Sequence, residues 1–293
     1  MEIKAVVFDW AGTTVDYGCF APVKGFINSF KSIGIDITTE MARKPMGLAK
    51  LDHTKEIAKM LTPPLSEESV LKVYAGFEEI LLNEIGSHCD LLDFIPETVA
   101  ALRMRGIKIG STTGYTSAMM KTVLRAAKAA GYAPDFCITP DQTARGRPYP
   151  YMIWENLKAF GLANPRQAVK VGDTAADIEE GKNAHCWTVG VVMGSSELGL
   201  TRAEAAALPR EELEKRKAAV RATYKEAGAD YSIDAIDALL PVIDDINGRM
   251  KESGCAAFMS LCRAAKNNGV QDWSLEEINS EINAARESRG DIQ

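Results

Sequence analysis

Short apolar runs alternate with longer amphipathic stretches over most of the chain. Runs typical of buried parallel strands occur at 3–8, 107–111, 136–138, 169–171 and 187–192. Apolar positions recur at helical spacing over 97–105, 117–130, 151–160 and 175–183. Strands separated by helices of this length favour right-handed βαβ units. The pattern therefore predicts an α/β fold with a doubly wound parallel sheet, to which 231–233 would add an edge strand.

One segment breaks this alternation. Residues 18–87 carry helical patterns, for example at 22–33, 53–61 and 67–85, and no convincing strand. The ligand crevice of an open α/β sheet lies at the carboxyl ends of its strands, so an insertion directly after the first strand is well placed to close the site. We therefore predict a helical cap domain of 18–87 inserted into a core of 1–17 and 88–250.

The last part of the chain is predicted to be helical. Residues 201–227 are rich in Ala, Glu and Arg and are expected on the outside of the core. Beyond residue 249 the composition shifts, and 255–268 and 274–288 have the pattern of two amphipathic helices. A Ser-x-x-Glu capping box at Ser274 and Glu277 would open the second. Residues 251–293 are thus predicted to be a C-terminal helical extension, whose role the sequence does not indicate.

Charge and composition exclude several classes of partner. The net charge of −6 gives no general attraction to nucleic acid or to an anionic membrane, so an anionic substrate must be met by local positive groups. No stretch approaches the ~18 apolar residues of a membrane span, and the first ten residues do not have the pattern of a signal peptide. The six cysteines are scattered without a C-x-x-C pair, which favours reduced thiols and a cytoplasmic location.

The first strand ends in a group suited to nucleophilic catalysis. Asp9 stands at its tip, followed by a turn through Gly12 and Thr13. A carboxylate fixed there could attack phosphorus, while the turn amides point toward an anion. Alone, such an Asp-x-x-Gly is weak evidence, because Asp9 could simply cap a turn.

Two further strand ends carry complementary groups. The strand at 107–111 leads into Thr113 and Gly114, whose hydroxyl and amide could bind phosphate oxygens. The strand at 169–171 leads into Asp173 and Asp177, and Mg²⁺ prefers one or two carboxylates together with water and phosphate oxygens. A plain turn, a helix N-cap and a solvated acid are the structural alternatives. Three strand ends in this order, each with a suitable functional group, favour a phosphate site over these alternatives.

At these residues the chain resembles the haloacid dehalogenase superfamily of phosphotransferases. Asp9, Thr113, Arg147 and the pair Asp173 and Asp177 match its four motifs in order, and the resemblance covers roughly residues 1–250. It implies that Asp9 forms an aspartyl-phosphate and that Arg147 supplies positive charge.

The same resemblance implies a magnesium enzyme. Mg²⁺ would be held by the Asp9 carboxylate, the Ala11 backbone carbonyl and Asp173. Asp177 would orient metal-bound water or a partner side chain. Thr113 and Gly114 would bind the phosphoryl oxygens.

Ala11 narrows the resemblance to one group within the superfamily. Phosphatases of the superfamily carry a second aspartate at this place as an acid–base for the leaving oxygen, whereas phosphonoacetaldehyde hydrolases have alanine. The chain is similar to the latter at 16–22, 111–115 and 146–150, and in the cap motif Met46-Gly47-Leu48-Ala49-Lys50-Leu51-Asp52-His53. It departs from them at 62–74, which is shorter, and at His185, where glycine is expected.

Cleavage of a P–C bond would explain why Lys50 and Ala11 occur in the same protein. Cleavage of a P–C bond expels a carbanion, and an iminium formed between a lysine and the aldehyde accepts those electrons, so no acid is needed on a leaving oxygen. The amine must be neutral, whereas the pKa of lysine in water is about 10.4; burial under the cap would lower it. A solvated cation is the default for a lysine at a helix start, and the surrounding motif outweighs that default.

The resemblance also suggests residues around Lys50. His53 is expected to be a proton shuttle, although a helical histidine is more often merely packed. Met46, Cys19 and Tyr115 are expected to line the pocket, and core packing explains Met46 and Cys19 equally well.

The leading hypothesis is hydrolysis of phosphonoacetaldehyde to acetaldehyde and phosphate. The alternatives are an ordinary phosphatase for a sugar phosphate or phosphoglycolate, and a non-catalytic relative that binds a metabolite or a protein. The resemblance further implies a homodimer paired through the cap, with Phe26, Ile27, Phe30 and Ile33 as the apolar face.

Overall fold

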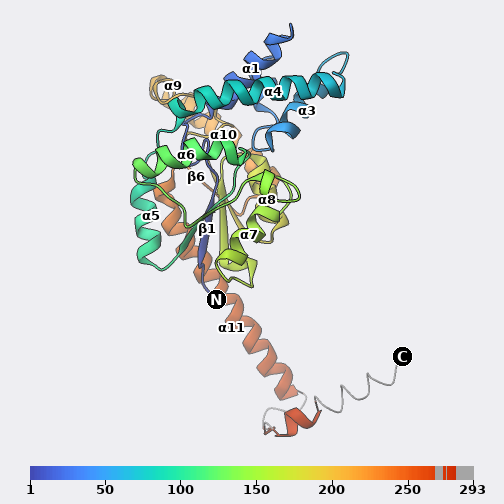
Figure 1. Cartoon of the computed structure of the whole chain (residues 1–293). Helices are drawn as coiled ribbons and strands as arrows, with labels where there is room; N and C mark the ends of the chain where they lie inside the picture. Colours follow the sequence, from blue (N-terminus) through green and yellow to red (C-terminus); the bar gives the residue numbers. More distant parts are fainter. Residues whose placement is uncertain (268–272, 275, 282–293) are drawn as a thin grey trace, which may run out of the picture. The chain divides into compact units, whose positions relative to one another are not determined.

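A parallel sheet of six strands forms the centre of the computed structural model (Figure 1), which describes residues 1–267, 273–274 and 276–281. The strands are β1 (Ala5–Phe8), β2 (Lys108–Ser111), β3 (Phe136–Cys137), β4 (Ala168–Gly172), β5 (Trp187–Val191) and β6 (Tyr231–Ile233). Their order is β3-β2-β1-β4-β5-β6. The predicted α/β class and the edge strand β6 are therefore confirmed.

The register of the sheet brings three strand ends to one edge. Phe8 of β1 pairs with Ser111 of β2 on one side and with Val171 of β4 on the other. The residues that follow these strands therefore emerge together, next to the point where the strand order reverses. Ligand sites of open α/β sheets lie at that place.

Helices cover both faces of the sheet. Figure 1 shows α5 and α6 on one side and α7 and α8 on the other, as right-handed crossovers require. Their bounds are α5 (Ile95–Met104), α6 (Ser117–Ala129), α7 (Tyr151–Ala159) and α8 (Ala175–Asn183). The positive φ of 60° at His185, just after α8, shows that the turn expected to hold glycine is made with histidine. That conformation costs a residue with a side chain about 1 kcal/mol.

The prediction of helix over 201–227 is wrong at one point. It is broken into α9 (Arg202–Ala207) and α10 (Arg210–Ala227). Leu208 between them is extended, with φ −68° and ψ 142°. It precedes Pro209, whose ring disfavours helical backbone at the residue before it.

The insertion between β1 and α5 is helical, as predicted. It contains α1 (Phe20–Ser32), α2 (Thr39–Arg43), α3 (Lys50–Lys59), α4 (Glu67–Glu84) and the 3₁₀ turn η1 (Ile85–His88). The short α2 was not predicted; the Thr38 side chain caps it by accepting a hydrogen bond from Met41 N–H.

Two of the four residues predicted to pair two caps are instead buried within the cap. Phe26 and Phe30 are fully buried inside the cap, and the ring of Phe26 stacks on Phe77 of α4 at 4.0 Å. The amphipathic face of α1 is thus used within the chain, which leaves only Ile27 and Ile33 of the predicted set partly exposed.

Two compact units divide the chain, Ile3–Asp244 and a second made of Met1–Glu2 and the residues from Asp245 onward. Helix α11 (Leu239–Asn267) begins well before the predicted start at 255 and runs without a break past residue 250. The predicted capping box is confirmed: Ser274 N–H donates to Glu277 Oε2 (2.7 Å) and Glu277 N–H to Ser274 Oγ (3.3 Å). Residues 268, 275 and 282–288 of the predicted helices lie outside the described residues.

None of the helices in the described residues combines the length and apolarity needed to cross a membrane. All six cysteines are unpaired in the structure.

Candidate active site

Asp9 is held at the end of β1 by backbone and side-chain contacts. Its N–H donates to the Val171 carbonyl of the neighbouring strand (2.8 Å), so the sheet fixes its backbone. Its carboxylate is buried, and Oδ1 accepts a hydrogen bond of 2.6 Å from Arg147 Nη2. A buried carboxylate fixed by the sheet and paired with a guanidinium is well placed to attack an electrophile.

Asp173 lies beside Asp9 with both oxygens engaged. Oδ1 accepts from Thr13 Oγ1 (3.0 Å) and Oδ2 from Ser196 N–H (2.8 Å). Burial, and then the charges of Asp9 and Asp177, raise the pKa of Asp173 well above its usual range. A Cβ on Gly12 would meet Asp173 Oδ2 at 2.2 Å, and its φ is +88°, so only glycine fits this turn.

Oxygen atoms of Asp9, Asp173 and Asp177 lie within 4.8 Å of one another, and all three side chains are buried. Hard oxygen donors in such a cluster suit Mg²⁺. A divalent cation would also offset the mutual repulsion that raises the pKa of Asp173. These residues therefore fit a metal ion.

The carboxylate of Asp177 forms ion pairs with two cationic side chains. Its Oδ1 lies 3.0 Å from Arg147 Nη1 and 2.8 Å from Lys170 Nζ, and Thr174 Oγ1 donates to Oδ2 (2.6 Å). Burial opposes ionisation, but the charges of Arg147 and then Lys170 overcome it and lower the pKa of the Asp177 carboxyl. This arrangement suits a group that orients its neighbours.

The sequence reasoning missed a second layer of charge below these groups. Glu180 Oε2 accepts from Arg147 Nε (2.9 Å) and Thr112 Oγ1 (2.9 Å), and Lys170 Nζ lies 3.3 Å away. Lys170 also donates to Thr112 Oγ1 (2.8 Å) and is fully buried in the middle of β4. A lysine inside a short apolar strand, with a glutamate three residues after Asp177, is the signal that could have revealed this layer.

A small cavity of about 20 Å³ lies between cap and core, roughly the room that one water needs. It brings together most of the predicted site residues. Its lining consists of Asp9, Ala11, Cys19, Met46, Gly47, Lys50, Thr113, Gly114, Tyr115, Arg147 and Thr174.

Two glycines allow the cap to approach the core so closely. A Cβ on Gly47 would meet Thr174 Oγ1 at 2.3 Å, and one on Gly114 would meet the Leu48 carbonyl oxygen at 2.5 Å. Any side chain at either position would therefore force the helical insertion away from the sheet.

Lys50 carries an amine from the cap into this cavity. It starts α3, is only 4 % exposed, and its Nζ lies 5.1 Å from the centroid of the Tyr115 ring. In the described part of the chain, no carboxylate lies within ion-pair distance of Nζ. Burial lowers the pKa of Lys50, and the Arg147 charge acts in the same direction. A buried lysine of this kind has a larger neutral fraction than one in water.

His53 lies one turn further along α3, within the cap. Its ring packs on Phe26 at 4.0 Å, and Nε2 donates to the Ala42 carbonyl (2.8 Å), while Nδ1 has no partner. Burial, and then the Lys50 charge, lower the pKa of His53 well below its usual range. His53 does not line the small cavity.

Cys19 and Met46 both line the cavity and are buried. Burial raises the pKa of the Cys19 thiol well above its usual range, so it contributes a neutral wall. Tyr115 lies against Lys50, as described above, and burial raises the pKa of its hydroxyl well above its usual range.

Comparison with known proteins gives consistent results. Residues 3–185 match the family model of haloacid dehalogenase-like hydrolases. The chain is 45% identical to a phosphonoacetaldehyde hydrolase of Bacillus cereus over 258 residues, covering 84% of this chain and 97% of that protein.

It is also 45% identical to the bifunctional phosphonoacetaldehyde hydrolase/aminoethylphosphonate transaminase of Clostridioides difficile, covering 94% of this chain and 47% of that protein. The crystal structure of a phosphonoacetaldehyde hydrolase-like protein from Oleispira antarctica is similar, with a TM-score of 0.82, 34% identity, and coverage of 85% of this chain and 94% of that one.

Proposed function

Because the chain belongs to the haloacid dehalogenase-like hydrolases, and within them to the phosphonoacetaldehyde hydrolase group, we propose that it hydrolyses phosphonoacetaldehyde to acetaldehyde and phosphate. One observation carries this proposal. The buried amine of Lys50 shares a cavity with the carboxylate of Asp9, and Ala11, which lines the same cavity, offers no acid to a leaving oxygen.

The first proposed step uses Lys50. Its neutral amine adds to the aldehyde carbon, a C–N bond forms, and the carbonyl oxygen leaves as water to give an iminium. The lowered pKa of the buried Lys50 supports this step, because only the neutral amine can add. The adjacent Tyr115 ring stabilises the resulting cation.

The second step uses Asp9. A carboxylate oxygen forms a bond to phosphorus, the P–C bond breaks, and its electron pair moves into the iminium to give an enamine. Protonation at carbon and addition of water release acetaldehyde and free Lys50. A second water hydrolyses the aspartyl-phosphate. Arg147, Thr113 and Gly114 line the same cavity and would bind the phosphoryl oxygens.

Mg²⁺ completes the proposed site. Asp9, the Ala11 carbonyl and Asp173 would hold it, and when bound it would neutralise charge between the nucleophile and the phosphonate. Asp177, paired with Arg147 and Lys170, would orient these groups. The proton-transfer role predicted for His53 would use Nδ1, since Nε2 is engaged with Ala42.

Borohydride trapping tests the proposal. Reduction in the presence of the aldehyde should add a covalent adduct to Lys50 and inactivate the enzyme, whereas borohydride alone should be harmless. Lys50→Arg should lose essentially all turnover, because a guanidinium stays protonated and cannot condense. Lys55→Arg on the same helix is the matched control and should remain active. An unmodified Lys50 in the inactivated enzyme would disprove the Schiff base.

A substrate panel separates P–C cleavage from the phosphatase alternative. Phosphate release should be rapid from phosphonoacetaldehyde and slow from phosphate monoesters, because Ala11 cannot protonate a leaving alkoxide. Faster release from a monoester would favour the phosphatase.

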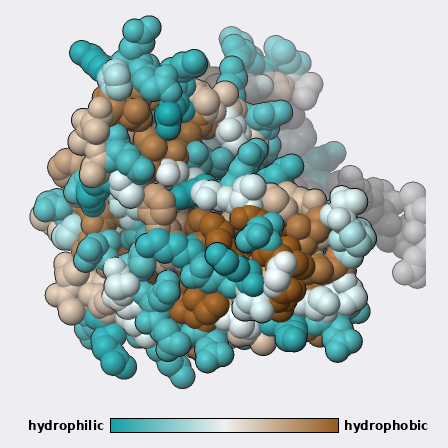
Figure 2. Space-filling model, turned by 90° about the horizontal axis from the view of Figure 1, so that it is seen from above, coloured by the Kyte–Doolittle hydropathy of each residue, from teal (hydrophilic) through white to brown (hydrophobic). Residues whose placement is uncertain are grey.

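A homodimer through the cap and a cytoplasmic location belong to the same proposal. Figure 2 shows apolar residues on the face seen from above, and Leu71 and Leu82 of α4 are 50% and 43% exposed. A monomer by light scattering at micromolar concentration would reject the dimer.

A further inference from the structure

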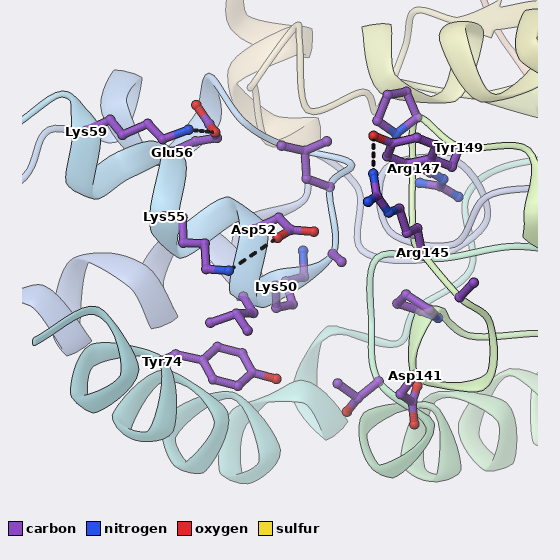
Figure 3. A pocket seen from close by; sticks show the side chains of 18 residues that line it. Lys50, Asp52, Lys55, Glu56, Lys59, Tyr74, Asp141, Arg145, Arg147 and Tyr149 are labelled. Atoms are coloured by element: carbon purple, nitrogen blue, oxygen red, sulfur yellow. Dashed lines mark hydrogen bonds and ion pairs between the residues drawn. The ribbon is translucent and has the colours of Figure 1, made fainter. Parts of the chain in front are cut away.

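A much larger pocket, of about 690 Å³, opens beside the catalytic cavity (Figure 3). Helix α3 of the cap forms one wall, and the core loop that carries Arg145 and Tyr149 forms the other. Lys50 and Arg147 line both this pocket and the small cavity. The larger pocket is therefore the space next to the catalytic groups on the solvent side.

Basic side chains outnumber acidic ones in this pocket, although the whole chain carries −6. Its lining holds five basic side chains and three acidic ones. Most of these charges are paired: Lys59 lies 2.6 Å from Glu56 and Lys55 lies 3.9 Å from Asp52, while Arg147 is held by the buried carboxylates described above. Asp141 accepts a hydrogen bond of 2.5 Å from the Ser117 hydroxyl.

Arg145 is the cation with the fewest constraints. Its guanidinium lies 4.7 Å from the centroid of the Tyr149 ring, and Nη1 donates to the Tyr149 hydroxyl at 2.6 Å. It makes no ion pair with a carboxylate within the described ranges, and its side chain is exposed. The remaining donors of the guanidinium can therefore bind an anion from solution.

The catalytic cavity is too small for the substrate in this structure. Its 20 Å³ admits a water but not an organophosphonate, and the larger pocket borders it at Lys50 and Arg147. A substrate coming from this side meets the larger pocket first. A net negative protein repels a dianion from most directions, and the guanidinium of Arg145 beside the catalytic cavity counteracts this repulsion.

We propose that the pocket is an anion-capture site that attracts the phosphonate group of the incoming substrate, with the charge of Arg145 as its main determinant. The inference rests on the proposed function for the identity of the substrate. The capture of a phosphorus dianion can be measured separately.

The expected effect follows from Coulomb's law. A unit charge about 8 Å from a dianion in water changes its local concentration about fourfold at 0.01 M ionic strength, and less than about twofold at 0.15 M. Arg145→Gln should therefore lower kcat/KM about fourfold at low salt. Arg145→Glu, which changes the charge by two, should lower it about 16-fold.

The test measures kcat and kcat/KM for phosphonoacetaldehyde at both salt concentrations. Arg145→Gln should lower kcat/KM at low salt with kcat unchanged, and Arg145→Lys should restore it. Lys158→Gln is the matched control, since Lys158 is exposed, pairs with Glu155 at i,i+3, and does not line the pocket. Equal values for Arg145→Gln and Lys158→Gln, or a loss that does not depend on salt, would overturn the proposal.

A second readout keeps this test separate from the proposed function. If the wild-type enzyme does not turn over phosphonoacetaldehyde, the proposed function fails, and binding of inorganic phosphate by calorimetry still tests capture. Arg145→Glu should weaken that binding at 0.01 M ionic strength by about 16-fold. Unchanged phosphate affinity would overturn the capture site.

Discussion

Removal of the Glu180 charge should destabilise the protein more than any exposed substitution on the same helix. Glu180 Oε2 lies 2.9 Å from Arg147 Nε and 3.3 Å from Lys170 Nζ. At an effective dielectric constant of about 20, each pair attracts by about 5–6 kcal/mol. Glu180→Gln loses this attraction, while the cost of burying the two cations stays.

The net loss should lie near the lower end of the 3–5 kcal/mol that breaking a buried pair costs, because Asp177 still balances both cations. We expect a loss of about 3 kcal/mol in the free energy of unfolding. For a chain of this size that corresponds to a melting temperature lower by roughly 6–12 °C.

Urea and thermal unfolding followed by circular dichroism would measure this loss. Glu179→Gln is the matched control, because Glu179 is the exposed neighbour on α8. The double variant Lys170→Met with Glu180→Leu should be more stable than Glu180→Gln, since an apolar pair leaves no unpaired charge. If Glu180→Gln lies within about 1 kcal/mol of Glu179→Gln, the buried pairs are not balanced as the structure indicates.

Three further predictions follow from the site. Asp173→Ala should abolish turnover and also the rise in melting temperature that Mg²⁺ gives the wild type; a Mg²⁺-dependent rise that persists would contradict the proposed ligand. Because burial lowers the pKa of Lys50, kcat/KM should rise with pH and level off below about 10.4, and a plateau only above that value would contradict a buried amine. Gly47→Ala should lower kcat/KM about 100-fold and also lower the melting temperature, since Gly47 has φ +90° and its Cβ would lie 2.3 Å from Thr174 Oγ1; near-normal kinetics would show that the contact between cap and core tolerates the methyl group.

The strand ends could be predicted from the sequence because parallel strands bring their carboxyl ends to one edge. Asp9, Thr113 and Asp173 were found in this way, from local patterns alone. The break at Leu208 was also visible in principle, since Pro209 follows it.

Other features depend on contacts that no local pattern contains. Phe26 and Phe30 lie one helical turn apart, and the same spacing serves a cap core and a subunit interface equally well. In the sequence, Lys170 is a charged residue within an apolar strand pattern. Its role depends on how β4 and α8 pack against the loop that carries Arg147. The left-handed turn at His185 follows from chain geometry that overrides the usual preference for glycine.

The amine and the carboxylate of the cavity come from different parts of the fold: Lys50 begins α3 of the helical insertion, and Asp9 follows β1 of the sheet. Under the proposed chemistry, a phosphate ester meets the carboxylate but offers no carbonyl to the amine. An aldehyde without phosphorus forms an imine that has nothing to transfer and simply reverts to the free aldehyde. Turnover thus requires a substrate that carries both an aldehyde and a phosphorus group. The enzyme can therefore discriminate against other aldehydes and other phosphates by its chemistry, without a closely fitting pocket.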